Sequence, residues 1–215
     1  VCDVSTLGKI DIQGSDAGAF LDLVYSNTFS TLAVGKTRYG LMLREDGMVM
    51  DDGTTARLGE THYVMTTTTA NAVGVYRHLE FVRQCLRPDM DVHLISGTDS
   101  WAQFAVAGPT ARAVLQKIID PQHDLSNEGF PFMACADISV CGGVAARLFR
   151  ISFSGELAYE IAVPSRYGDA MIRALMEAGE PFDITPYGTE ALGVMRIEKG
   201  HVTGNELNGT ITARN

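Results

Sequence analysis

Two stretches of the chain share one pattern of apolar and polar positions. Residues 10–24 and residues 104–118 each begin with a short strand-like stretch, alternating apolar and polar in the first copy and apolar in the second, continue with a glycine, Gly14 or Gly108, and end with apolar residues spaced three and four apart. Both kinds of stretch before a glycine are typical of a strand, and the three-and-four spacing is typical of one face of a helix. The pattern therefore predicts a strand, a tight turn and a helix, twice.

This internal repeat predicts two related lobes. Ser15 and Pro109 support the two helix starts, because both residue types favour the first positions of a helix. A solenoid would need at least three short repeats, whereas only two copies are recognisable. We therefore expect two lobes with a common plan, residues 1–98 and residues 99–215.

Each copy is followed by a hairpin signal and a further helix. In the first lobe the β-rich runs are 48–58 and 62–68, and Asn71 is expected to cap the helix that follows. In the second lobe the strands are expected at 145–153 and 157–163, and the helices at 165–178 and 185–199. Gly200 is expected to end the last helix. The chain is therefore predicted to be an α+β protein of two antiparallel-sheet lobes.

Composition and charge narrow the classes of function. The 215 residues are 46% hydrophobic and 20% charged, which excludes disordered and collagen-like proteins. A formal charge of -9 repels a phosphate backbone, so we expect no nucleic-acid partner. Charges or glycines interrupt every apolar run, so we expect no membrane partner and no secretory signal. Four cysteines without a C-x-x-C pair predict the reduced thiols of a cytoplasmic protein, and five histidines without ligand spacing predict no metal site.

The first candidate for chemistry is a carboxylate in the strand predicted at 48–58. Side chains alternate along a strand, so Met48, Met50 and Asp52 are expected on one face and Asp51 on the other. Asp52 then lies on the more apolar face, where a carboxylate is paired, shifted in pKa or available to a ligand, because burying it alone is expensive. The alternative is a strand-edge carboxylate solvated by water.

The second candidate is Glu160, in the strand predicted at 157–163. Alternation places Tyr159 and Ile161 on one face and Glu160 on the other, between Ala158 and Ala162. Small neighbours leave space over the carboxylate for a flat ligand, and one carboxylate can accept from two adjacent N–H donors. The alternative is an outward-facing glutamate on a half-exposed sheet.

Four stretches of the sequence follow one another in a recognisable order. They are KIDIQG at 9–14, REDGMVMDD at 44–52, ISFSGELAYE at 151–160, and DITPYGTE at 183–190, which continues to RIEKG at 196–200. Together they resemble the glycine-cleavage T-protein superfamily, and within it the C-terminal folate domains of sarcosine oxidase alpha subunits. The resemblance implies a T-protein type folate-binding module that lacks its C-terminal barrel segment, and an N-terminal part outside this chain.

The resemblance also implies roles for individual residues. Asp52 matches the catalytic Asp of the family, and Glu160 matches the Glu that binds the pterin ring of tetrahydrofolate. Phe153 falls where many members carry a Tyr that packs against the pterin. Thr67 falls near an Asn that contacts the ligand in T-proteins. The Arg that many T-proteins supply from the last helix aligns with Leu192, so another group is expected to hold the folate tail.

By the same resemblance, the module transfers the one-carbon unit of oxidised sarcosine to tetrahydrofolate, giving 5,10-methylenetetrahydrofolate and glycine. Flavins (FAD, FMN) and NAD are expected only in parts of the complex outside this segment, with other sarcosine oxidase subunits as partners in a hetero-oligomer. One alternative is a folate-binding regulatory or iron–sulfur maintenance module without transfer chemistry. In that group a reactive Cys stands where this chain has His201. Another alternative is a docking piece without folate affinity.

Overall fold

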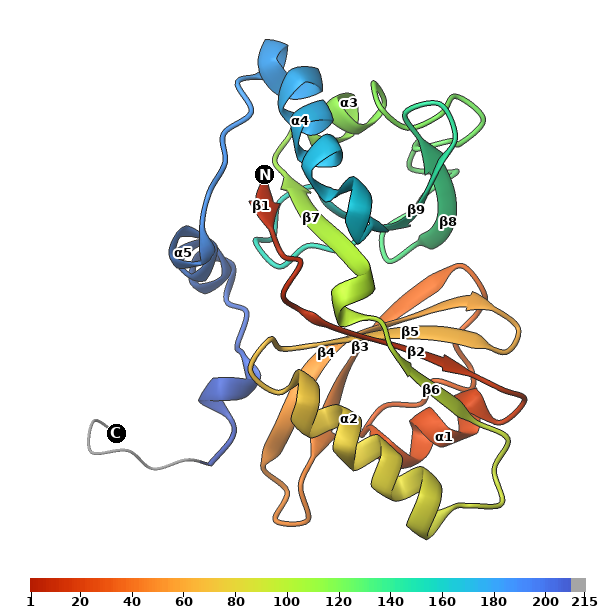
Figure 1. Ribbon diagram of the computed structural model, residues 1–215. Helices are drawn as coiled ribbons and strands as arrows, with labels where there is room; N and C mark the ends of the chain where they lie inside the picture. Colours follow the sequence, from red (N-terminus) through yellow and green to blue (C-terminus); the bar gives the residue numbers. More distant parts are fainter. Residues whose placement is uncertain (210–215) are drawn as a thin grey trace. The chain divides into compact units, whose positions relative to one another are not determined.

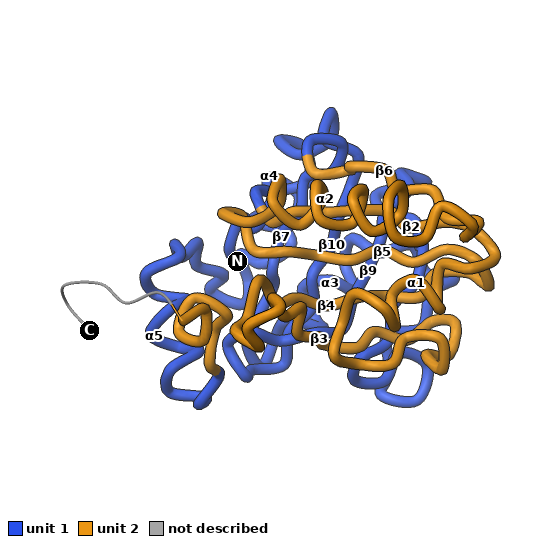
Figure 2. Tube along the Cα trace, turned by 90° about the horizontal axis from the view of Figure 1, so that it is seen from below, with its two compact units in different colours: residues 1–6, 99–201 blue, residues 7–98, 202–215 orange. Residues whose placement is uncertain are grey.

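The computed structural model describes residues 1–209 and divides into two compact units, coloured separately in Figure 2. Unit 1 comprises Val1–Thr6 and Asp99–His201, and unit 2 comprises Leu7–Thr98 and the described residues from Val202 on. The lobes expected from the repeat, 1–98 and 99–215, differ from these units at the chain's two ends. Residues 1–6 belong to unit 1 because Cys2 and Asp3 form a strand that pairs with the strand beginning at Trp101.

Unit 1 is built on a five-stranded antiparallel sheet of order β1-β7-β10-β9-β8. Figure 1 labels β1, β7, β8 and β9 of this sheet. Its strands are β1 (Cys2–Asp3), β7 (Trp101–Ala107), β8 (Cys135–Val140), β9 (Val144–Phe149) and β10 (Ala158–Pro164). Its α-helices are α3 (Ala111–Leu115), α4 (Gly168–Gly179) and α5 (Thr189–Lys199), and its short 3-10 turns are η2 (Thr98–Ser100), which begins in unit 2, η3 (Ser165–Tyr167) and η4 (Glu180–Phe182).

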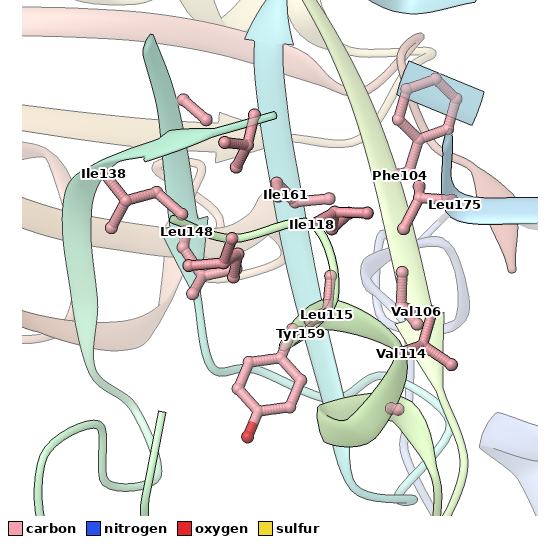
Figure 3. Close-up of a cluster of buried hydrophobic side chains, with 14 of the residues drawn as sticks. Phe104, Val106, Val114, Leu115, Ile118, Ile138, Leu148, Tyr159, Ile161 and Leu175 are labelled. Carbon is pink, nitrogen blue, oxygen red and sulfur yellow. The ribbon is translucent and has the colours of Figure 1, made fainter. Parts of the chain in front are cut away.

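The core of unit 1 lies between one face of this sheet and the helices α3 and α4. Figure 3 shows Phe104 and Val106 of β7, Ile161 of β10, Leu115 of α3 and Leu175 of α4 converging on it, and all five are buried. No residue of α5 is buried. The opposite face of the sheet contributes no strand residue to this core, so it remains for other roles.

Unit 2 contains a second five-stranded antiparallel sheet, of order β3-β4-β5-β2-β6. Its strands are β2 (Gly8–Gln13), β3 (Lys36–Leu43), β4 (Val49–Gly59), β5 (His62–Thr67) and β6 (His93–Ser96). Its helices are α1 (Ala17–Val24), α2 (Ala72–Phe81), the π-helical turn η1 (Val82–Leu86) and the 3-10 turn η5 (Gly204–Glu206). The helices α1 and α2 cover one face of the sheet (Figure 1) and share a buried core with it. The predicted fold class is confirmed.

The internal repeat is confirmed in backbone detail. Gly14 joins β2 to α1 and Gly108 joins β7 to α3, with φ of 133° and 129°. In both turns the glycine carbonyl accepts a bond from the backbone N–H three residues on, at Ala17 (3.2 Å) and at Ala111 (3.1 Å). Residues that carry a Cβ rarely adopt such a φ, so both turns of the repeat depend on glycine.

Several predicted boundaries are wrong by a few residues. The helices α1 and α3 begin at Ala17 and Ala111, each two residues after the predicted start, and the Ser15 hydroxyl donates to Asp91 (2.9 Å) instead of capping. Asn71 is at the predicted N-cap position of α2, but its amide donates to the carbonyl of Met50 (2.9 Å) rather than capping the helix.

Two elements of the second lobe are shorter than predicted. The strand predicted at 145–153 ends at Phe149, because the chain then leaves the sheet in a loop that contains Gly155 at a φ of 84°. The helix predicted at 185–199 begins only at Thr189, because the backbone N–H of Tyr187 donates to the Val1 carbonyl (2.9 Å) and Thr185 precedes a proline. Gly200 ends this helix in the left-handed conformation, as predicted.

Candidate functional site

Asp52 lies in β4 of unit 2, directly after a bulge. Leu43 of β3 pairs with Val49, but Met42 pairs with Asp51, so Met50 is an extra residue in β4. Met50 packs against the core of unit 2, whereas Val49 and Asp52 both approach Gly204. The expectation that Met50 and Asp52 share a face is therefore wrong, because the bulge interrupts the alternation on which it depended.

The Asp52 carboxylate is held by one donor on each oxygen. The Tyr39 hydroxyl donates to Oδ2 (2.8 Å), and the backbone N–H of Gly204 donates to Oδ1 (2.8 Å). Burial, followed by the hydrogen bond to Asp52, raises the pKa of Tyr39, so the phenol remains a donor at neutral pH. A methyl group on Gly204 would collide with the carboxylate, so glycine permits this close approach. Asp52 is thus fixed in direction and half-buried rather than solvated.

Asp51, the neighbour of Asp52, has a different environment. It is 4% exposed and accepts hydrogen bonds from the Thr68 hydroxyl (2.6 Å), the Thr68 backbone N–H (3.1 Å) and the Asn71 amide (3.3 Å). Burial raises the pKa of Asp51, and the bonds from Thr68 and Asn71 oppose the rise. Asp51 therefore fixes the loop between β5 and α2, and Asp52 is left as the carboxylate suited to chemistry.

Thr67, the third candidate of the first lobe, is buried. Its hydroxyl donates to the carbonyl of Thr68 (3.0 Å), and its side chain lies against Gly8, which is its partner residue in β2. A Cβ at Gly8 would collide with the Thr67 hydroxyl. Thr67 thus has a packing role in the structure, and its contact with a ligand stays a prediction.

Glu160 lies in β10 of unit 1, on the face of the sheet away from α3 and α4. The residues on either side, Tyr159 and Ile161, belong to the core, as the alternation predicted. Ala105 of β7 and Phe149 of β9 are the direct cross-strand partners of Glu160, and Ala158 and Ala162 are its neighbours on the same face of β10. The three alanines are small and leave space beside the carboxylate for a flat ligand, whereas Phe149 is its neighbour on the side of β9.

Gln103 of β7 donates from its side-chain amide to Oε2 of Glu160. Two further groups interact with the charge of Glu160. Burial raises the pKa of Tyr187 to about 12, and the charges of Cys2 and Glu160 add to the rise. Burial likewise raises the pKa of the Cys2 thiol, with a smaller contribution from Glu160. Cys2 and Tyr187 are therefore neutral at pH 7, as is the amide of Gln103.

Phe153 lies in the loop between β9 and β10 and is 39% exposed. Its ring is 6.2 Å from the ring of His201, and its carbonyl is 2.9 Å from Nδ1 of His201. The His201 carbonyl in turn accepts from Arg196 of α5 (3.0 Å). The end of α5 therefore fixes an exposed aromatic ring in the same unit as Glu160.

The candidates divide between the two units. Asp52 and Thr67 belong to unit 2, whereas Glu160 and Phe153 belong to unit 1. The sequence analysis did not select Tyr39 or Gln103, which hold the two carboxylates. Gln103 interrupts an apolar strand at alternate spacing with Ala105, a signal that marks the face of β7 opposite the core.

Other kinds of site find no support in residues 1–209. Within this range no three His, Cys, Asp or Glu side chains gather as they would around a metal ion. None of the helices described in these residues has the length and apolar character needed to cross a bilayer. All four cysteines are free thiols, buried at Cys2 and Cys135 and exposed at Cys85 and Cys141.

Comparison with known proteins identifies relatives along the whole chain. The chain is 61% identical over 212 residues to sarcosine oxidase subunit alpha of Rhizobium meliloti, covering 98% of this chain and 21% of that protein. It is 32% identical over 207 residues to an aminomethyltransferase of Chloroherpeton thalassium, covering 95% of this chain and 54% of the relative. The chain therefore spans about a fifth of the first relative and about half of the second.

A solved structure supports the same assignment at the level of the fold. The glycine cleavage system aminomethyltransferase T from Bartonella henselae superposes with a TM-score of 0.81 at 24% identity, over 96% of this chain and 52% of that one. The family model for the GCVT N-terminal domain matches residues 1–215. From its two antiparallel sheets, its repeated strand–glycine–helix units and this match over its whole length, the chain belongs to the GCVT N-terminal domain family.

Proposed function

We propose that this chain binds tetrahydrofolate and transfers a one-carbon unit to it within a sarcosine oxidase-type enzyme. The observation that carries the proposal is the environment of Glu160, whose carboxylate has three alanines among its neighbours on the sheet and accepts a hydrogen bond from the amide of Gln103. The pterin ring has adjacent N3–H and 2-amino donors, and one carboxylate accepts such a pair. The 61% identity to a sarcosine oxidase alpha subunit supports the choice of substrate.

In the proposed reaction, the oxidation of sarcosine elsewhere in the enzyme supplies a methylene imine of glycine. The N5 nitrogen of tetrahydrofolate forms a bond to the imine carbon as the C=N π bond breaks, and the N5 proton is transferred to the imine nitrogen. The N10 nitrogen then attacks the same carbon, glycine leaves as the amine, and the N10 proton balances the leaving group. The product is 5,10-methylenetetrahydrofolate, and no further oxidant is consumed in this step.

Asp52 and Glu160 would contribute differently to this reaction. Asp52, directed by Tyr39 and Gly204, would stabilise the positive charge that develops on the folate nitrogens and assist proton movement. Glu160 would fix the orientation of the pterin, with Phe153 offering a ring for stacking. FAD, FMN and NAD would bind parts of the enzyme outside this chain, and the name of the relative as a subunit supports partner subunits.

The role of Glu160 is tested by Glu160→Gln in the whole protein. The substitution replaces one acceptor oxygen with an N–H donor that faces the donors of the pterin, so we expect a weakening of 5-formyltetrahydrofolate binding by at least tenfold, or about 1.4 kcal/mol. Isothermal titration calorimetry measures the change. Glu156→Gln, an exposed carboxylate in the preceding loop, is the matched control and should bind like the wild type. Equal binding by the Glu160 variant contradicts the pterin contact.

The role of Asp52 is tested by Asp52→Asn, which keeps the size of the side chain and removes its charge. We expect folate binding within about threefold of the wild type and formation of 5,10-methylenetetrahydrofolate slowed by at least a hundredfold, or about 2.7 kcal/mol. Single-turnover product formation from sarcosine gives the rate. Unchanged product formation, with binding retained, would remove Asp52 from the mechanism.

A further inference from the structure

We propose that Gln103 is a positioning residue for the ligand-binding carboxylate of Glu160, and that its amide fixes the plane in which that carboxylate meets its ligand. The inference rests on the proposed function, because it concerns how Glu160 receives a ring with two adjacent N–H donors. It assigns a role to a residue that would touch Glu160 and not the reacting atoms.

The side-chain amide of Gln103 is held in one position by burial and by its backbone. The residue is 1% exposed, and both its backbone N–H and its carbonyl form hydrogen bonds. The Val4 N–H donates to the Gln103 carbonyl (2.9 Å), and the Gln103 N–H donates to the Ser5 hydroxyl (3.0 Å). A buried side chain on a backbone held in this way has few rotamers available, so it can orient a neighbour without a large entropy cost.

The sheet register brings this amide to Glu160. Gln103 pairs directly with Ala162, and Glu160 pairs with Ala105, so Gln103 and Glu160 are diagonal neighbours on one face. Diagonal neighbours on antiparallel strands are within reach of long side chains. The small side chains of Ala105 and Ala162 leave the path open, and Nε2 of Gln103 donates to Oε2 of Glu160.

The chemistry of an amide suits this task better than the alternatives do. A lysine at position 103 would neutralise the carboxylate and compete with the ligand, a leucine would offer no donor, and a second carboxylate would repel the first when both are charged. The amide is neutral, and its bond to a carboxylate is charge-assisted. A carboxylate has about four lone-pair sites, and the bond from Gln103 uses one of them.

The other titratable groups near Glu160 define the background for a pH test. On its sheet face these are Cys2 of β1, Arg147 of β9, and Cys135 and Asp137 of β8. Asp137 pairs with Arg147, and Tyr187 approaches from the segment before α5. The helices α3 and α4 pack on the opposite face of the sheet. Cys2 and Tyr187 have raised pKa values, so they stay neutral between pH 5 and pH 8.

The test measures 5-formyltetrahydrofolate binding by calorimetry between pH 5 and pH 8, in the whole protein with any subunits that copurify. Gln103→Leu should weaken binding at pH 7 by at least tenfold and should move the pH midpoint of binding upward by about one unit, because the charged form of Glu160 loses a hydrogen bond. In Gln103→Glu the new carboxyl group shares a proton with Glu160. Below about pH 6 its O–H replaces the amide donor, so affinity should approach the wild-type value and then fall as pH rises.

If Gln103 had a purely structural role, Gln103→Glu would lower affinity at every pH, without the recovery of affinity expected below about pH 6, and that result would overturn the proposal. The matched control is Gln122→Leu. It removes a glutamine–hydroxyl bond to Ser139 (2.8 Å) in the same unit, and it should leave affinity and pH profile unchanged. Wild-type affinity and midpoint in Gln103→Leu also overturn the proposal. If the wild type itself fails to bind the folate, the proposed function fails, and that outcome is distinct.

A second measurement does not depend on folding of the Gln103 variants. In protein labelled with nitrogen-15 at glutamine side chains, one amide should exchange slowly with solvent and should shift when Glu160 is replaced by Gln. Because Gln103 is 1% exposed and bonded to Glu160, we assign that signal to it. A glutamine spectrum that does not respond to Glu160→Gln overturns the proposal.

Discussion

Replacement of Asp51 by alanine tests whether the first carboxylate of the Asp51–Asp52 pair is structural. The variant removes the acceptor of three hydrogen bonds, two from Thr68 and one from Asn71. Each bond to a charged acceptor contributes roughly 1.5–3 kcal/mol, and the cost of burying the charge offsets much of that sum. We expect a net decrease of about 2–3 kcal/mol in the free energy of unfolding, which corresponds to a loss of about 4–12 °C in Tm.

The pH dependence of this decrease has a definite sign. The pKa of Asp51 is raised by burial, so the folded state binds a proton more tightly than the unfolded state does. The contribution of Asp51 to stability is therefore fully present below its unfolded-state pKa of about 3.9, and it is lost as pH rises through the higher folded-state pKa. We expect the cost of Asp51→Ala to be larger at pH 4 than at pH 7.

Circular dichroism during thermal and urea unfolding, at pH 4 and pH 7, measures both quantities. The matched control is Asp46→Ala in the same hairpin, where an exposed carboxylate pairs with Arg44 (2.8 Å) and should leave Tm unchanged. A cost below about 0.5 kcal/mol for Asp51→Ala, or a cost that increases from pH 4 to pH 7, would refute this account.

Two further substitutions test the packing around the candidate residues. Gly204→Ala adds a methyl group that collides with the Asp52 carboxylate, so the rate of product formation should fall while folate affinity stays within about threefold of the wild type. Single-turnover kinetics measures the rate, and an unchanged rate would mean that Gly204 does not direct Asp52. Leu175→Ala leaves a cavity in the buried core of unit 1 and should lower the free energy of unfolding, measured in urea titrations, by about 2–5 kcal/mol. Leu86 is 59% exposed, so the control Leu86→Ala should change that free energy by less than about 0.5 kcal/mol, and equal effects of the two variants would contradict the assigned core.

The parts of the fold that could be predicted are those that local patterns determine. The strand–glycine–helix repeat was visible because Gly14 and Gly108 both require a backbone conformation that other residues rarely adopt. The orientation of Glu160 was predictable because β10 is regular, so that Tyr159 and Ile161 enter the core and Glu160 does not. In both cases short-range geometry is sufficient.

The parts that could not be predicted depend on distant segments of the chain. The sequence around Met50 does not indicate that it is the extra residue of a bulge, because the bulge is defined by the register of β4 with β3. The roles of Tyr39 and Gln103 likewise follow from strand pairing, because each reaches its carboxylate from a neighbouring strand. Sequence reasoning selected Asp52 and Glu160 by residue type, and tertiary structure supplied the groups that orient them.

The assignment of residues 1–6 to unit 1 has a consequence for the order of folding during synthesis. The sheet of unit 1 begins at β1 but cannot add its next strand until β7 has left the ribosome, almost a hundred residues later. Apart from the 3-10 turn η2, the strands and helices between them belong to unit 2, where Gly97 donates to the Lys9 carbonyl (2.8 Å). If that intervening segment folds first, its two ends, which lead to β1 and β7, are held close together. The two strands can then pair without the entropy cost of closing a long flexible loop.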